Sequence, residues 1–113
     1  MRQVEHEEIK LQLGGMLFTW DDEKERINIR KHGVDFRTAA SVFLDGDIVL
    51  EENSVDIYTG EIRMEAIGAT TGLNRLYFVI YVERMTSGNN DIIRIISARR
   101  AEKKERIRYV NGA

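Results

Sequence analysis

The spacing of hydrophobic residues divides the chain into a mixed first third and a strand-rich remainder. Leucines within 11–19, interrupted by Gly14-Gly15, predict a first strand or hairpin. From residue 48 onward, apolar residues come in short alternating or continuous runs, which are typical of strands. Four further strands are predicted, at 48–51, 61–67, 76–82 and 92–97. Short turns separate these strands, so neighbouring strands are predicted to be antiparallel.

Two helices are predicted between the first hairpin and the later strands. Asp22 followed by Glu25 has the spacing of a capping box, and Gly33 suits the position just after a helix end. The second helix begins after Asp35, buries apolar residues spaced three and four apart, and ends at Asp45-Gly46.

The last predicted element is a basic helix over 98–110, with Ile107 and Val110 as its buried anchors. The order of elements predicts an α+β fold, an antiparallel sheet of four to five strands with two N-terminal helices and a C-terminal helix. A length of 113 residues suits one domain, 1–113. We expect residues 1–15 to be an N-terminal extension and residues 16–110 to form the core.

Composition narrows the class of protein. A hydrophobic content of 42% with a net charge of −2 excludes a disordered chain. The absence of cysteine excludes a disulfide scaffold, a thiolate nucleophile and a Cys-ligated metal. No apolar run approaches the roughly 18–20 residues of a membrane span, and the Glu-rich N-terminus shows no secretory signal. We therefore expect a cytoplasmic enzyme or binding domain with no membrane partner.

Charge is distributed unevenly along the chain. Residues 20–60 carry ten acids and five bases, a net charge of −5, whereas residues 91–113 carry seven bases and three acids, a net charge of +4. A polyanion responds to the local field within about 10 Å rather than to the average charge. The basic C-terminal segment is therefore compatible with RNA, DNA or an acidic protein partner.

Motifs for cofactor and metal chemistry are absent from the sequence. It contains no Gly-rich phosphate loop and no Gly-x-Ser-x-Gly elbow, and its two histidines cannot by themselves make a metal site. We therefore expect no cofactor and no metal.

Arginines placed within apolar segments are the stronger candidates for chemistry. Arg63 lies on the polar face of the strand at 61–67, and Arg94 interrupts a run of isoleucines. An arginine at such a position either reaches solvent or is held in a cleft, because burying its unpaired charge costs several kcal/mol. A cross-strand salt bridge with a glutamate is the alternative to a functional role; the candidates are Glu61, Glu65 and Glu83.

Other charged residues have structural alternatives as well. Arg99 and Arg100 would begin the final helix, where cations oppose the helix dipole, or they form an exposed basic face. Lys31 and His32 close the first predicted helix, where a favourable dipole interaction accounts for both. Tyr109 is an acid, a phosphate contact or a helix anchor against the sheet.

RNA cleavage is a reaction that such a set of residues can support. RNA can be cleaved by its own 2′-hydroxyl, so a protein need only align that group, neutralise charge on the phosphorane and move protons. Arginine and lysine stabilise the charge without a metal. The composition is therefore sufficient for a small ribonuclease.

An ordered set of short motifs carries a family resemblance. The motifs are Trp20-Asp21, Asn28-Ile29-Arg30-Lys31-His32-Gly33-Val34, Phe36, Ala39-Ala40, Val42-Phe43, Gly60-Glu61-Ile62-Arg63, Arg94-Ile95-Ile96-Ser97-Ala98-Arg99, Glu105-Arg106 and Tyr109. In this order they resemble the BrnT toxins, the toxin half of a bacterial type II toxin–antitoxin system in the RelE-like group. The resemblance runs from about residue 18 to residue 109.

The resemblance implies a RelE-like fold and RNA cleavage that arrests growth. It also implies a cognate antitoxin, a ribbon-helix-helix DNA-binding protein, whose complex with the toxin represses their operon. Operator DNA would be contacted only through that complex. The catalytic residues it implies are Lys31, His32, Arg63, Arg94 and Tyr109, and those for RNA or antitoxin binding are Glu61, Arg99 and Arg100. Arg63 and Arg94 would hold the scissile phosphate, and Lys31 or His32 would move protons.

Two alternative functions stay open. One is a binding module that holds an antitoxin or nucleic acid without turnover. The other is a structural protein whose basic helix docks an acidic surface, which predicts no affinity for RNA.

Overall fold

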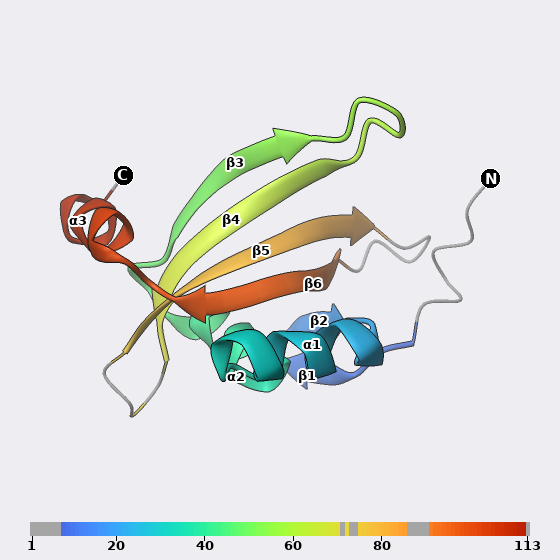
Figure 1. Cartoon of the computed structure of the whole chain (residues 1–113), viewed down its shortest axis with the longest axis horizontal. Coiled ribbons are helices and arrows are strands. Elements are labelled where there is room, and N and C mark those ends of the chain that lie inside the picture. The colour runs from blue at the N-terminus through green and yellow to red at the C-terminus, as the bar shows by residue number, and fades with distance from the viewer. Residues whose placement is uncertain (1–7, 71, 73–74, 86–90, 113) are drawn as a thin grey trace.

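The computed structural model describes residues 8–70, 72, 75–85 and 91–112. These residues form a six-stranded sheet in the order β1-β2-β6-β5-β4-β3 (Figure 1). The strands are β1 (Leu11–Leu13), β2 (Met16–Thr19), β3 (Val49–Val55), β4 (Ile62–Ala69), β5 (Leu76–Met85) and β6 (Asp91–Arg100). The predicted hairpin at 11–19 is confirmed as β1 and β2, and the predicted central strand at 76–82 is confirmed within β5.

The α+β class is confirmed, but the predicted sheet was wrong in two respects. The described residues contain six strands rather than four to five, and the sheet is mixed because β2 and β6 run parallel. The other strand pairs are antiparallel. Local turns determine only pairs that are neighbours in sequence. The pairing of β2 with the last strand depends instead on where the chain returns after it has formed the rest of the sheet.

Helices α1 (Asp22–His32) and α2 (Phe36–Ser41) follow the first hairpin, and a 3₁₀ turn, Val42–Leu44, extends α2. The N-cap of α1 is Asp21 rather than Asp22, because its carboxylate accepts a hydrogen bond from the Lys24 N–H at 2.9 Å. The predicted capping box was therefore wrong: the Glu25 carboxylate instead accepts a hydrogen bond from the Phe36 N–H and ties α1 to α2.

The last helix, α3 (Lys103–Asn111), begins later than predicted. Residues 98–100 continue β6, so Arg99 and Arg100 end a strand and do not oppose a helix dipole. The helix begins after Glu102, whose N–H donates to the Glu105 carboxylate at 2.6 Å. This local hydrogen bond fixes the start of the helix, and the hydrophobic pattern alone could not locate it.

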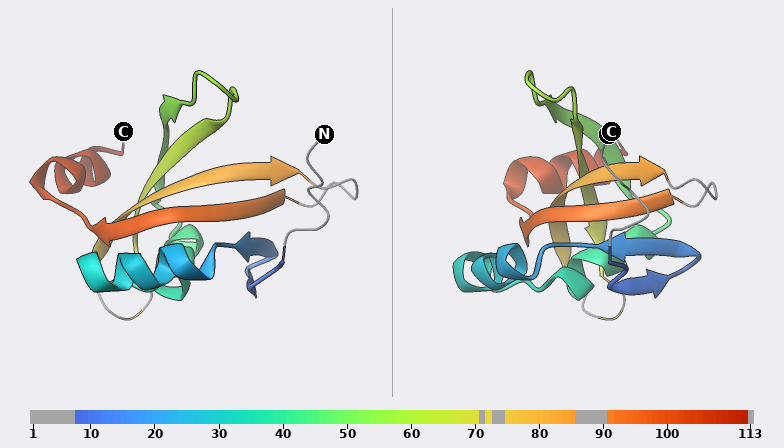
Figure 2. Two further views of the ribbon diagram at one scale, coloured as in Figure 1. Left: turned by 45° about the vertical axis from the view of Figure 1, so that its right-hand side comes forward. Right: turned by 90° about the vertical axis from the view of Figure 1, so that its right-hand side faces the viewer.

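The core lies on one face of the sheet. Phe36, Ala39 and Ala40 of α2 pack there with aromatic and aliphatic residues of β5 and β6, among them Tyr81 and Ile95. Helix α1 instead runs beside the edge of β6, and α3 lies at the far end of the sheet (Figures 1 and 2).

Ile107 and Val110, predicted as buried anchors of the last helix, are 51% and 81% exposed. Polar contacts, rather than these two residues, attach α3 to the sheet, as described below. Residues 1–7 of the predicted N-terminal extension lie outside the described residues, and residues 11–13 of it belong to the sheet as β1. In the described part of the chain no helix is long and apolar enough to cross a membrane.

Candidate nucleic-acid interface

The face of the sheet opposite the core carries half of the predicted site residues. We call it the open face. Tyr81 and Ile95 pair across β5 and β6, and both point into the core. Because successive side chains of a strand point to opposite faces, the neighbouring pair Val82 and Arg94 lies on the open face. The same alternation places Arg63 and Glu65 of β4, and Glu61 just before β4, on this face. The register of β6 against β5 shifts between Ile80 and Tyr81, so Arg99, which lies opposite Phe78, is on this face as well.

Arg63 and Arg94 lie in one row across the open face. Met64 pairs with Tyr81, so the next position along β4 places Arg63 opposite Val82, which is itself opposite Arg94. Two strand spacings separate the Cα atoms of the two arginines by about 10 Å. Val82, which is buried, forms the floor between them. Two guanidinium groups at this separation can hold one phosphate between them.

The surroundings of the two arginines differ. The side chain of Arg63 makes no hydrogen bond or ion pair with another residue of the described chain, whereas Arg94 does interact with other groups. The pKa of Asp21 is held below its ordinary value, first by the hydrogen bond from the Lys24 N–H and to a smaller degree by Arg94. Arg94 therefore lies near the start of α1.

Two carboxylates flank Arg63 on β4, and both accept ion pairs. Glu61 pairs with Arg84 of β5 at 3.2 Å. Glu65 is buried and pairs with Arg108 of α3 at 2.7 Å, and it also accepts a hydrogen bond from the Asn53 side chain. Glu61 and Glu65 therefore do form salt bridges. Their cations are Arg84 and Arg108, and not the predicted Arg63 or Arg94.

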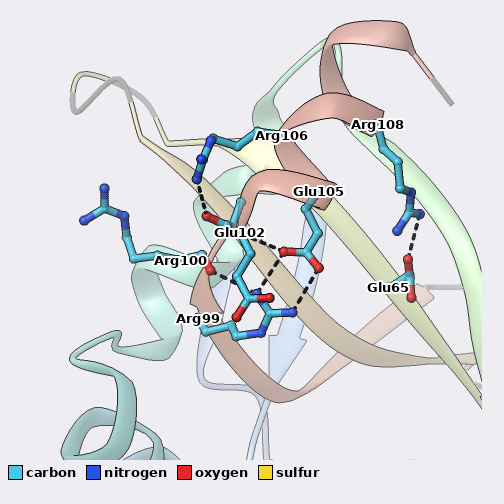
Figure 3. A network of polar contacts seen from close by, with 8 residues as sticks. Glu65, Arg99, Arg100, Glu102, Glu105, Arg106 and Arg108 are labelled. Atoms are coloured by element: carbon cyan, nitrogen blue, oxygen red, sulfur yellow. Dashed lines mark hydrogen bonds and ion pairs between the residues drawn. The ribbon is translucent and has the colours of Figure 1, made fainter.

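Arg99 is committed to a contact within the protein (Figure 3). Its guanidinium binds both carboxylate oxygens of Glu105 at 2.9 and 3.0 Å and lies 4.4 Å from the centre of the Phe78 ring. Glu105 is only 1% exposed. Arg99 therefore joins β6 to α3. The Arg100 side chain is exposed and points away from this network.

Tyr109 also contacts another part of the protein. Its hydroxyl donates to the Asp45 carboxylate at 2.6 Å. This hydrogen bond, with burial, raises the pKa of Tyr109 to about 12. A phenol held in this way is a weak acid at neutral pH, and the contact fastens α3 to the turn before β3.

Lys31 and His32 are not brought to the arginine row. Both are exposed in the last turn of α1. The Asn28 side chain hydrogen-bonds both the N–H and the C=O of Ala98, so the helix end lies beside the end of β6 (Figure 1). Arg94 lies four strand residues earlier, and Lys31 one helical turn later, which together separate them by about 18 Å along the strand.

Among the described residues no group of three His, Asp or Glu side chains gathers where it could hold a metal ion.

Comparison with known families shows to which family the chain belongs. The model of one family, described as the ribonuclease toxin BrnT of type II toxin–antitoxin systems, matches residues 20–105. The chain belongs to the BrnT family. No curated relative matches it.

The BrnT match begins and ends close to the resemblance inferred from the motifs, but stops at residue 105 rather than 109. It includes Arg63, Arg94 and the Arg99–Glu105 pair. Arg108 and Tyr109 lie outside it, as does the hairpin of β1 and β2.

Sequence reasoning missed three residues that organise this region: Asn28, Arg108 and, as a partner of Arg99, Glu105. Only Glu105 had a local signal, because it follows Glu102 at the spacing of a capping box. Asn28 and Arg108 act on residues 70 and 57 positions away, Ala98 and Glu51, which no local pattern indicates.

Proposed function

We propose that this BrnT protein is a metal-independent endoribonuclease toxin whose active surface is the open face. The arginine row supports the proposal most directly, because Arg63 is a cation with no partner in the described chain and lies beside a second arginine on the same face. A bound RNA phosphate would supply the anion that Arg63 lacks.

The reaction follows from the chemistry of RNA. The 2′-oxygen attacks the adjacent phosphorus, the bond to the 5′-oxygen breaks, and the products carry a 2′,3′-cyclic phosphate and a 5′-hydroxyl. Arg63 and Arg94 would stabilise the negative charge that develops on the phosphorane. The 2′-hydroxyl gives its proton to a base and the leaving 5′-oxygen gains one.

Glu61 is the carboxylate we assign as the base. It lies two residues before Arg63 on the same face. Its side chain is 32% exposed and pairs with Arg84 at 3.2 Å, whereas that of Glu65 is 10% exposed and pairs with Arg108 at the shorter distance of 2.7 Å. The proton-transfer roles predicted for Lys31, His32 and Tyr109 have no comparable geometric support, since these residues lie away from the arginine row.

We further propose that RNA cleavage arrests growth in the bacterial cytoplasm. A cognate antitoxin, a ribbon-helix-helix protein, would neutralise the toxin and carry it to operator DNA. The family membership supports this pairing.

A cleavage assay with purified protein tests the proposal. The substrate is a labelled RNA oligonucleotide, and the controls are the same oligonucleotide with 2′-deoxyriboses and the reaction in EDTA. We expect cyclic-phosphate ends on RNA, no cleavage of the deoxy substrate and no effect of EDTA.

Substitutions of single arginines then test where the active site lies. Arg63→Ala and Arg94→Ala should abolish cleavage in folded protein, whereas Arg37→Ala, an exposed arginine of α2 on the core side, should not. Full cleavage by both row variants would remove the row from the site. RNA binding without any product from the wild type would instead indicate a non-catalytic binding module.

A further inference from the structure

Strand β3 forms one edge of the sheet, and its outer side has no neighbouring strand in the described chain (Figure 1). Six of its seven residues are exposed. The opposite edge, β1, has only three residues, and α1 covers the end of β6 through Asn28. An exposed strand edge offers unpaired N–H and C=O groups to another chain. β3 is therefore the longest free edge of the sheet.

The surface around this edge is both acidic and apolar. Residues 38–62 contain six acids, Asp45, Asp47, Glu51, Glu52, Asp56 and Glu61, and no base. Leu50 and Val55 of β3 are each 49% exposed, and they lie with Glu52 on the side of the strand that faces away from the open face. Arg108 pairs with Glu51, but Glu52 has no cationic partner among the described residues.

The hairpin beyond β3 extends the apolar surface. Asp56 holds the turn by accepting hydrogen bonds from the N–H groups of Tyr58 and Gly60. Ile57 and Tyr58 at its tip are 84% and 91% exposed. This turn follows directly after β3 (Figure 2), so both exposed apolar residues lie next to the end of the free edge in the sequence.

We propose that the β3 edge, defined by Leu50, Glu52 and Val55, binds a basic, apolar segment of the cognate antitoxin as an added β-strand. Main-chain hydrogen bonds along the edge would supply affinity, and alternate side chains would supply specificity. Apolar residues of that strand would contact Leu50 and Val55, and a lysine or arginine would face Glu52. The proposal rests on the proposed pairing with an antitoxin.

Charge selects this partner over the other occupants. A second copy of the toxin would place its own Glu51 and Glu52 against the same acidic strand, and like charges across a strand pair are destabilising. RNA would be repelled by Glu52 and by Asp47 and Asp56 before and after β3, none of which has a cationic partner among the described residues. A basic strand is attracted by the same charges.

The test uses the full toxin and the antitoxin encoded beside it. The Leu50→Lys/Glu52→Lys variant should bind the antitoxin at least about tenfold more weakly, the loss of roughly one hot-spot contact. Ile29→Lys and Glu83→Lys are matched controls, since Ile29 is 45% exposed and Glu83 is exposed elsewhere. They should change affinity less than the variant does. Amides of Val49–Val55 should gain protection from hydrogen exchange in the complex.

RNA cleavage by the same samples separates the two proposals. The variant should cleave RNA like the wild type, yet resist antitoxin that silences the wild type. Unchanged antitoxin affinity, loss of RNA binding, or a wild-type dimer that the variant disrupts would each overturn the docking proposal. A wild type that cleaves RNA but binds no antitoxin overturns the docking and leaves the nuclease standing. A wild type that binds antitoxin through this edge without cleaving RNA supports the docking proposal and overturns the nuclease proposal.

Discussion

At the scale of single residues, the Arg99–Glu105 pair shows how one contact can have a structural role inside a candidate site. The hydrogen bonds from Arg99 are the main reason that the pKa of Glu105 lies below its ordinary value. A carboxylate with a lowered pKa stabilises the folded state above its ordinary pKa, and this stabilisation is lost as the pH falls through the lowered value.

Glu105→Gln should therefore lower the free energy of unfolding by about 2 kcal/mol at neutral pH, because it removes the buried charged partner of Arg99 and leaves only the more distant, exposed Glu102. The difference from the wild type should shrink in acid, below about pH 4.3, the ordinary pKa of a glutamate. Urea unfolding at pH 7 and pH 3 measures both. Glu83→Gln, at an exposed site, should show neither effect.

Tyr109 allows a second test at this scale. Its proton is held by Asp45, and its pKa of about 12 keeps the phenol protonated at neutral pH. Although burial raises the pKa of Asp45, the hydrogen bonds from Tyr109 and from two backbone N–H groups hold it below its ordinary value. Tyr109→Phe should cost about 1 kcal/mol of stability and leave the pH profile of RNA cleavage unchanged. A displaced cleavage profile in a fully folded variant would restore Tyr109 to the catalytic set.

Residues of the candidate site were predictable where their signal was local. Arg63 and Arg94 stood out because each is a charge within a strand pattern. Their position in one row was not predictable, since it depends on the register of β4, β5 and β6. The partner of Glu65 was missed for a similar reason: Arg108 lies on α3, dozens of residues after β4 in the sequence.

At the scale of elements, α1 is attached to the sheet by one polar side chain. Asn28 is the only buried residue of α1, and it bonds the backbone of Ala98 and the C=O of Val34. It replaces a neighbouring strand at the point where β2 has ended. The hydrophobic pattern predicted the helix correctly but could not show that a polar residue docks it.

Asn28→Ala should lower the free energy of unfolding by about 2–3 kcal/mol, because it leaves buried backbone groups of Ala98 unpaired. Ile29→Ala, at the exposed neighbouring position, should cost less than about 0.5 kcal/mol. Thermal or urea unfolding of the two variants gives the comparison. Equal costs would mean that solvent satisfies the Ala98 backbone once the side chain is removed.

For helix α3, the hydrophobic pattern predicted the wrong buried face. Ile107 and Val110 have the spacing of a buried stripe, but Glu105, Arg108 and Tyr109 make the contacts with the sheet. Apolar spacing indicates which side chains share a helix face. Which face is buried depends on the partners that the fold provides.

At the scale of the whole molecule, the distribution of charge governs binding more than the net charge of −2. The arginine row lies on the open face, whereas the acidic segment 38–62 includes the far edge of the sheet. Single-stranded RNA that binds through its phosphates releases counterions, so its association constant falls with salt, with a slope of about −0.7 per phosphate contact on logarithmic axes.

Removing one phosphate contact should therefore change that slope by a known amount. We expect Arg63→Ala to make the slope shallower by about 0.7, and Arg37→Ala to leave it unchanged. The measurement is the dissociation constant of a non-cleavable 2′-deoxy oligonucleotide at several salt concentrations. A weaker affinity with an unchanged slope would mean that Arg63 acts on the shape of the face and does not bind a phosphate. The slope thus distinguishes an arginine that contacts RNA from one that only supports the sheet.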